Sequence, residues 1–154
     1  MVFDQLIADE LFDFVEISIN TDLSVAKCYQ ESLKGRKLIP ICTSEAHRFE
    51  RRFGDYYTIV FASELDKEHL FEALFDSRCI AVGHHPGDYG RLTGYLDLVE
   101  FADFLIREFF PIHDRICVLE SELLRRIIDG EDDHNPMLGI LKTQLVSLYA
   151  KYWA

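Results

Sequence analysis

Two patterns of apolar residues divide this chain and constrain its fold more than any other feature. Up to residue 94, short β-rich apolar runs alternate with stretches of helical periodicity, which is the pattern of an α/β protein. From residue 95 onward, only apolar stripes at helical spacing recur. We therefore expect an α/β domain over residues 1–94, followed by a helical extension over residues 95–154.

The expected strands cover residues 14–19, 38–42, 57–61 and 79–82. Asp22 can cap a helix that ends near Leu33, and Gly35 supplies the left-handed residue that terminates it. Asp66 can cap a second helix in the same way. A strand, a helix and a strand within about 30 residues form a βαβ unit, so we expect parallel strands joined by right-handed crossovers. Pro40 cannot donate a ladder hydrogen bond, which makes the second strand less suited to the centre of a sheet.

Three apolar stripes predict the helices of the extension. They comprise Leu98, Phe101, Leu105 and Phe109; Ile112, Ile116, Leu119, Leu123 and Ile127; and Leu138, Leu141, Leu145, Leu148 and Tyr152. Pro111 suits the first turn of a helix, so we expect the second helix to begin there. We interpret the acidic segment Gly130–Asp133 as a solvated loop before the third helix.

Composition and charge exclude several classes of function. With 49% hydrophobic and 28% charged residues, the chain has the profile of one ordinary globular domain. The sequence has 16 Lys and Arg residues but 27 Asp and Glu residues. The resulting net charge of -11 disfavours binding to a nucleic acid duplex or an anionic membrane. The sequence lacks a long apolar run and a secretory signal pattern, so we expect a soluble, cytoplasmic protein without membrane contacts.

The four cysteines are too far apart in the sequence to suggest a metal site. They are Cys28, Cys42, Cys79 and Cys117, with no CxxC pair and no histidine at metal-ligand spacing. We interpret them as reduced packing residues.

The end of the second expected strand carries the most informative pair of side chains. Glu45 and His47 are two residues apart, and in extended backbone such side chains share a face. At the carboxyl end of a parallel strand, they would point to the edge where α/β proteins build active sites. A carboxylate and an imidazole are ligands that suit a divalent metal. The same pair is also compatible with a solvated loop.

The segment around this pair resembles a known family. Ser44-Glu45-Ala46-His47-Arg48 is similar to the Ser-Asp-Ala-His segment that closes the metal site of the PHP (polymerase and histidinol phosphatase) superfamily. Residues 14–20, 58–62 and 74–82 resemble the strands and helix around that segment, and residues 104–114 resemble a carboxy-terminal extension of some bacterial PHP proteins. The resemblance therefore runs over most of the chain, although only the Ser-Glu-Ala-His segment is specific.

The resemblance implies a distorted (βα)₇ barrel that hydrolyses phosphoesters with up to three divalent metal ions, such as Mn, Fe or Zn. Metals in such sites activate water and neutralise the phosphoryl oxygens. By position, His47 would be a metal ligand and Glu45 would stand where the family has Asp. The substrate would be a small phosphorylated molecule.

Two departures from the family pattern point to an incomplete site. Glu45 in place of Asp moves the carboxylate outward by one methylene. The His-x-His motif of the family's first strand is missing from this sequence. We therefore expect the carboxy-terminal half of a PHP protein, a partial barrel with at least one open sheet edge, which is inactive as an isolated chain.

Other polar residues offer weaker signals. Arg48, Arg51 and Arg52 form a basic cluster that could bind phosphate, or could pair with the neighbouring acidic residues Glu45, Glu50 and Asp55. His84 and His85 could bind metal or phosphate near a strand end, or could belong to a polar turn. His113 is interpreted as a packing or capping residue at a helix start.

Two functional hypotheses follow from the sequence. The first is a PHP-type metal-dependent phosphoesterase in which Glu45 and His47 hold metal and Arg48 and Arg51 bind phosphate. The alternative is a non-catalytic assembly module. In that case an open sheet edge or the apolar faces of the last helices pair with a second copy or with a separate amino-terminal partner.

Overall fold

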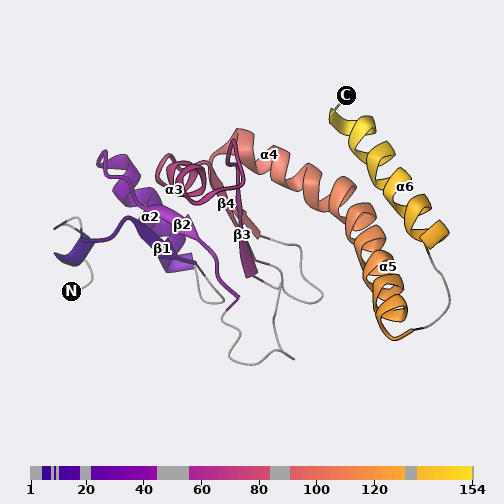
Figure 1. Ribbon diagram of the computed structural model, residues 1–154. Helices are drawn as coiled ribbons and strands as arrows, with labels where there is room; N and C mark the ends of the chain where they lie inside the picture. Colours follow the sequence, from indigo (N-terminus) through magenta and orange to yellow (C-terminus); the bar gives the residue numbers. More distant parts are fainter. Residues whose placement is uncertain are drawn as a thin grey trace. The chain divides into compact units, whose positions relative to one another are not determined.

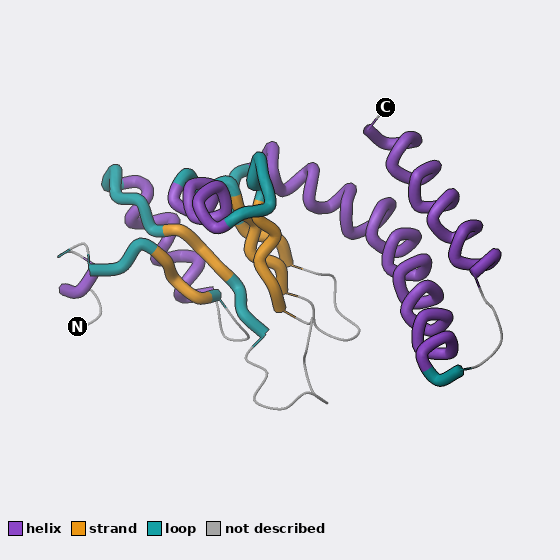
Figure 2. The backbone as a smooth tube through the Cα atoms, viewed as in Figure 1, coloured by secondary structure: helices purple, strands orange, loops and turns teal. Residues whose placement is uncertain are grey.

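The computed structural model describes residues 5–7, 9, 11–17, 22–44, 56–83, 91–130 and 135–153. The chain forms two compact units, Met1–Ala102 and Asp103–Ala154. In chain order, the elements of the first unit are β1 (Phe14–Glu16), α2 (Asp22–Leu33), β2 (Ile39–Ile41), β3 (Tyr56–Val60), α3 (Lys67–Phe75), β4 (Cys79–Gly83), β5 (Arg91–Thr93) and most of α4 (Leu96–Phe104) (Figure 1). The second unit contains η1 (Leu105–Phe109), α5 (Phe110–Ile128) and α6 (Asn135–Trp153). The expected combination of helices and strands is thus confirmed (Figure 2).

Strands β1 and β2 form the parallel pair that the βαβ pattern predicts. Phe14 lies opposite Ile39, and Glu16 lies opposite Ile41. The connecting helix α2 ends as expected, because Gly35 has a φ of 76° and its N–H donates to the carbonyl of Ser32. Pro40 fits this pair because its neighbours in β2 bond to the chain of β1: the Ile39 N–H donates to Asp13, and the Ile41 carbonyl accepts from Ile17. The missing N–H of Pro40 therefore falls on the side of β2 away from β1.

The expectation of parallel strands is wrong for the rest of the sheet structure. Strands β3, β4 and β5 form an antiparallel sheet in that order, and β5 lies outside the four strands expected from the sequence. The end of β3 meets the start of β4, since Val60 pairs with Cys79. Helix α3 therefore lies in a long hairpin connection and does not cross the sheet. Its short apolar face explains this placement, because only Ala73 is buried and Phe75 remains 45% exposed.

Strand β4 forms the most deeply buried part of the first unit. Cys79, Ile80, Ala81 and Val82 are all at most 2% exposed, as a continuous apolar run predicts for a strand covered on both faces. Ala81 joins a core cluster that also includes residues of α2, the parallel pair and β3: Ile7, Val15, Ile17, Cys28, Leu38, Cys42 and Tyr56. This shared core packs the parallel pair against the antiparallel sheet.

The second unit is a helical hairpin held by one apolar stripe and an aromatic cluster. Ile116 and Leu123 of α5 and Leu141 and Leu148 of α6 are buried, as the stripes predict. The start of α5 lies beside the end of α6, because the ring of Phe109 is 4.5 Å from that of Trp153. Phe104, His113, Tyr149 and Tyr152 complete the aromatic cluster.

The expected helix start at Pro111 proves to be a change of helical geometry. Helices α4, η1 and α5 follow one another without a loop, and η1 is a π-helical turn. The N–H of Phe110 donates to the carbonyl of Leu105, five residues earlier. Pro111 has no N–H and its ring crowds the preceding turn, which accounts for the wider turn at this point. None of the helices in the described part of the chain is long and apolar enough to cross a membrane.

Candidate functional site

The carboxyl ends of β1 and β2 come together at one edge of the parallel pair. Glu16, the last residue of β1, is exposed, and its carboxylate accepts a hydrogen bond from the hydroxyl of Thr43, just after β2. Sequence reasoning did not single out Glu16. The alternation of buried Val15, exposed Glu16 and buried Ile17 was a signal that could have placed its carboxylate at this edge.

Cys42 fixes the course of the chain as it leaves β2. Its N–H donates to Oγ1 of Thr58 at 2.9 Å, and the Thr58 hydroxyl donates back to the carbonyl of Cys42 at 2.8 Å. The thiol of Cys42 donates to the carbonyl of Ile17. Burial, with a contribution from the negative charge of Glu16, raises the pKa of this thiol to about 11. Cys42 is therefore a neutral structural group, as the sequence suggests, and it fixes the chain immediately before Thr43.

The predicted site residues follow directly on this anchored segment. Ser44 is the last described residue before Glu45. Glu45, His47, Arg48 and Arg51 all lie outside the described residues, and so do Arg52, His84 and His85. The placement of Glu45 and His47 at the carboxyl edge of the parallel strands stays a prediction.

Of the histidines considered in the sequence analysis, His113 lies within the described residues, whereas His47, His84 and His85 do not. Its ring stacks on Phe109 with 5.3 Å between ring centroids, and its Nδ1 lies 3.0 Å from a carboxylate oxygen of Asp114. The thiol of Cys117 lies 3.7 Å from Nε2. These contacts give His113 a packing role on α5.

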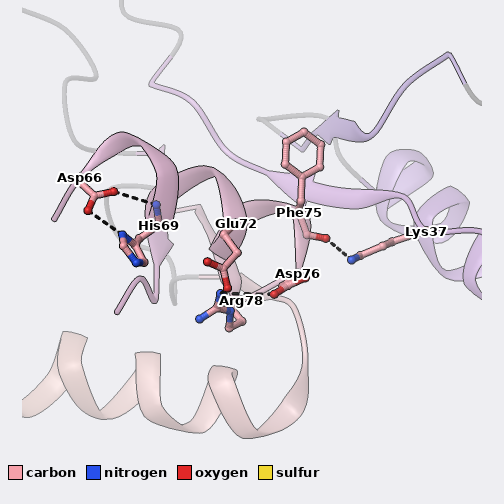
Figure 3. A network of polar contacts seen from close by, with 7 residues as sticks. All are labelled: Lys37, Asp66, His69, Glu72, Phe75, Asp76 and Arg78. Carbon is pink, nitrogen blue, oxygen red and sulfur yellow. Dashed lines mark hydrogen bonds and ion pairs between the residues drawn. The ribbon is translucent and has the colours of Figure 1, made fainter. Parts of the chain in front are cut away.

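The described residues contain one group of three potential metal ligands, at the start of α3. Ligand atoms of Glu64, Asp66 and His69 all lie within 4.8 Å of one another. Asp66 is the helix cap that the sequence predicts, since its Oδ1 accepts the N–H of His69 at 2.9 Å. Its Oδ2 lies 2.7 Å from Nδ1 of the same histidine (Figure 3). The backbone N–H of His69, followed by its ring, lowers the pKa of Asp66. Both carboxylate oxygens of Asp66 are thus engaged by His69. Capping of α3 therefore explains why Asp66 and His69 lie close together.

The far end of α3 is also held by polar contacts. Arg78 lies 2.9 Å from a carboxylate oxygen of Glu72 and 3.4 Å from one of Asp76. The ammonium of Lys37 donates to the carbonyl of Phe75, where the helix ends (Figure 3). These contacts position the helix relative to the start of β2.

The pair of polar side chains described at the carboxyl edge of β1 and β2 does not form a metal site by itself. It consists of the carboxylate of Glu16 and the hydroxyl of Thr43, which are hydrogen-bonded to each other. A zinc ion, for example, takes at least three protein ligands in most structural and catalytic sites. The residues that follow Ser44 would have to provide the others.

Comparison with known proteins found no match among protein-family models, curated proteins or solved structures. A functional proposal therefore depends on the residues and geometry described above.

Proposed function

We propose that this chain provides part of a metal-dependent phosphoesterase site of the PHP type. Glu45 and His47 hold divalent metal at the carboxyl edge of β1 and β2, and Glu16 faces the same site. The observation that carries the proposal is the pairing of Glu16 with Thr43, two residues before Glu45. It supports the proposal because active sites of parallel βα proteins are built at this edge of the sheet.

The proposed chemistry assigns separate roles to the acidic and basic residues. A divalent metal supplies an activated water and neutralises the oxygens of the phosphoryl group. Arg48 and Arg51 bind those oxygens through charged hydrogen bonds and orient a small phosphorylated substrate. Further metal ligands are needed, because the His-x-His motif of the family is missing from this sequence. We therefore propose that the isolated chain is inactive and that an amino-terminal half supplies these ligands.

Metal binding and turnover test this proposal together. The chain is combined with a PHP amino-terminal half that carries His-x-His, loaded with Mn²⁺, Fe²⁺ or Zn²⁺ and assayed with p-nitrophenyl phosphate. We expect stoichiometric metal and phosphatase turnover, both lost in His47→Ala. His113→Ala is the matched control, because His113 packs on α5 and should leave both unchanged. Metal content and turnover that survive His47→Ala would contradict the proposal.

A second candidate function, a non-catalytic assembly module, is favoured by the apolar surface of the helical hairpin. Val118 and Ile128 of α5 are 57% and 83% exposed, and Ile140 and Val146 of α6 are 59% and 67% exposed. Exposed apolar faces of this kind commonly mark protein interaction surfaces. They would pair with a second copy or with the separate amino-terminal partner.

Size measurement with and without metal separates the two functions. The assembly module predicts a stable complex by light scattering in EDTA, which the double variant Ile140→Glu/Val146→Glu disrupts. Lys142→Glu, on the same helix, is the control for the added charge. A monomer at all concentrations, alone and with the amino-terminal half, would exclude this candidate.

A further inference from the structure

The turn that ends α3 contains a serine in a backbone conformation that normally requires glycine. The N–H of Ser77 donates to the carbonyl of Leu74, and the N–H of Arg78 donates to that of Ala73, which is the pattern of a Schellman turn. Ser77 has a φ of 60°. The corresponding turns after α2 and α5 use Gly35 and Gly130, with φ of 76° and 79°. Among the described residues, Ser77 is the one non-glycine residue in this region of backbone space.

Ser77 is also largely buried, with 8% of the residue exposed. Strained backbone that persists often marks a functional position. Ser77 lines a cavity of about 350 Å³ between α2, β2 and the β4–β5 pair. This volume is in the range of sites that bind small molecules.

The cavity combines an apolar wall with two cations. Val25, Leu38 and Pro40 contribute to the apolar side, and Arg36 and Lys37 line it just before β2. Lys37 reaches the carbonyl of Phe75, two residues before Ser77 (Figure 3). That contact uses one of its three N–H donors. Arg36 donates through Nη1 to Glu31 at 3.0 Å, which leaves further guanidinium N–H groups available.

The surroundings of the cavity favour a negatively charged ligand. Lys27, Lys34 and Arg36 all lie within ion-pair distance of one carboxylate, Glu31, at 3.7, 2.7 and 3.0 Å. With Lys37, this part of the surface is cationic, although the whole chain carries a net charge of -11. A local positive field in an acidic protein raises the concentration of anions at that point.

We propose that this cavity binds a small organic anion with an apolar body. Its carboxylate or phosphate group is bound by Lys37 and Arg36, its body packs on Leu38 and Pro40, and the hydroxyl of Ser77 hydrogen-bonds a polar atom of the ligand. The site lies at the amino end of β2, whereas Glu16 and Thr43 lie at the carboxyl ends of the parallel strands. It is therefore independent of the proposed phosphoesterase site.

Titration with three matched probes tests the charge requirement. Phenyl phosphate, benzoate and neutral benzyl alcohol are added to the full chain, and amide NMR signals of Ser77 and Lys37 are followed. We expect both anions to shift these signals and benzyl alcohol to bind at least about tenfold more weakly, since charged hydrogen bonds contribute most. The tighter of the two anions identifies the preferred group. Equal binding of benzyl alcohol, or unshifted signals with every probe, would overturn the proposal.

Variants at Ser77 test the role of its hydroxyl independently of folding. Ser77→Gly relieves the backbone strain, so Tm rises by about 2–4 °C, while the Kd for the preferred anion rises about 2- to 10-fold. Ser77→Ala raises the Kd equally without the gain in Tm. Lys37→Gln weakens binding about tenfold, and Lys67→Gln, which removes a cation at the start of α3 outside the cavity lining, leaves it unchanged. Wild-type affinity in both Ser77 variants would overturn the assignment.

Discussion

The two compact units bury their apolar residues to different degrees. In Met1–Ala102, Ala73 and Ile80 are 0% exposed, and β4 is covered on both faces. In Asp103–Ala154, the most buried of the described residues is Phe109 at 5%, while Ile128 is 83% exposed. Each helix of a two-helix hairpin has one neighbour within its unit and can cover only one stripe. The first unit therefore has a core of its own, whereas the outer faces of the second unit remain exposed among the described residues.

Removing the side chain at the centre of the first unit should have the largest effect. Ile80→Ala deletes atoms from a fully buried position, so the free energy of unfolding should fall by about 2–5 kcal/mol. Ile140→Ala, the same substitution at a 59% exposed position of α6, should change it by less than about 0.5 kcal/mol. Urea denaturation measures both. Similar losses in the two variants would remove the contrast between the units.

Adding a methyl group to the first unit should also be harmful. A Cβ on Gly94 would lie 2.3 Å from Cδ1 of Ile80 and 2.9 Å from the backbone oxygen of Cys79. The backbone cannot yield as a side chain can, so Gly94→Ala should lower the free energy of unfolding by about 1–3 kcal/mol. An unchanged denaturation midpoint would show that β4 and β5 pack less closely than described.

The charge cluster on α2 should give a smaller effect that depends on pH. The hydrogen bond from Lys34, with the charges of Arg36 and Lys27, lowers the pKa of Glu31 below its ordinary value. The stabilisation is therefore complete above the ordinary carboxyl pKa and is lost as pH falls through the folded-state pKa. Glu31→Gln should lower Tm at pH 7 and flatten the acid limb of the Tm profile. A profile identical to wild type would contradict the lowered pKa.

The smallest expected effect is a gain in stability in the hairpin. Gly139 lies within α6, and a Cβ built there meets nothing within 4 Å. Gly139→Ala should therefore raise the free energy of unfolding by about 0.5–1 kcal/mol through helix propensity. A loss of stability that grows with protein concentration would instead show that a second chain covers this face.

Local signals predicted much of the fold. The runs of β-branched and aromatic residues located β1 to β4, Asp66 capped its helix and Gly35 ended another. Apolar stripes at helical spacing located the helices of the second unit. These features arise from interactions between residues that are close together in the sequence, so they could be predicted from it.

Strand direction depended on contacts that the sequence pattern does not contain. A helix between two strands suggested a crossover, but α3 buries too little to cover a sheet, and β3 returns antiparallel to β4. Strand β5 was missed because its three residues lie among glycines. At the candidate site, Glu16 was missed because its partner, Thr43, is 27 residues away. Ser77 was missed because its backbone conformation becomes visible only in the folded turn.

The π-helical turn η1 lets the helical run contain one extra residue without changing the phase of the residues that follow. Its N–H groups bond five residues back rather than four, so one turn holds one more residue than an α-helical turn. Loss of a single codon within Leu105–Phe109 would therefore restore regular α-helical bonding and leave the apolar stripe of α5 against α6. The same loss in the middle of α5 has no such turn to absorb it, and it would rotate the rest of that stripe by about 100° away from α6. Tolerance to a change in length is thus confined to one short segment of the hairpin.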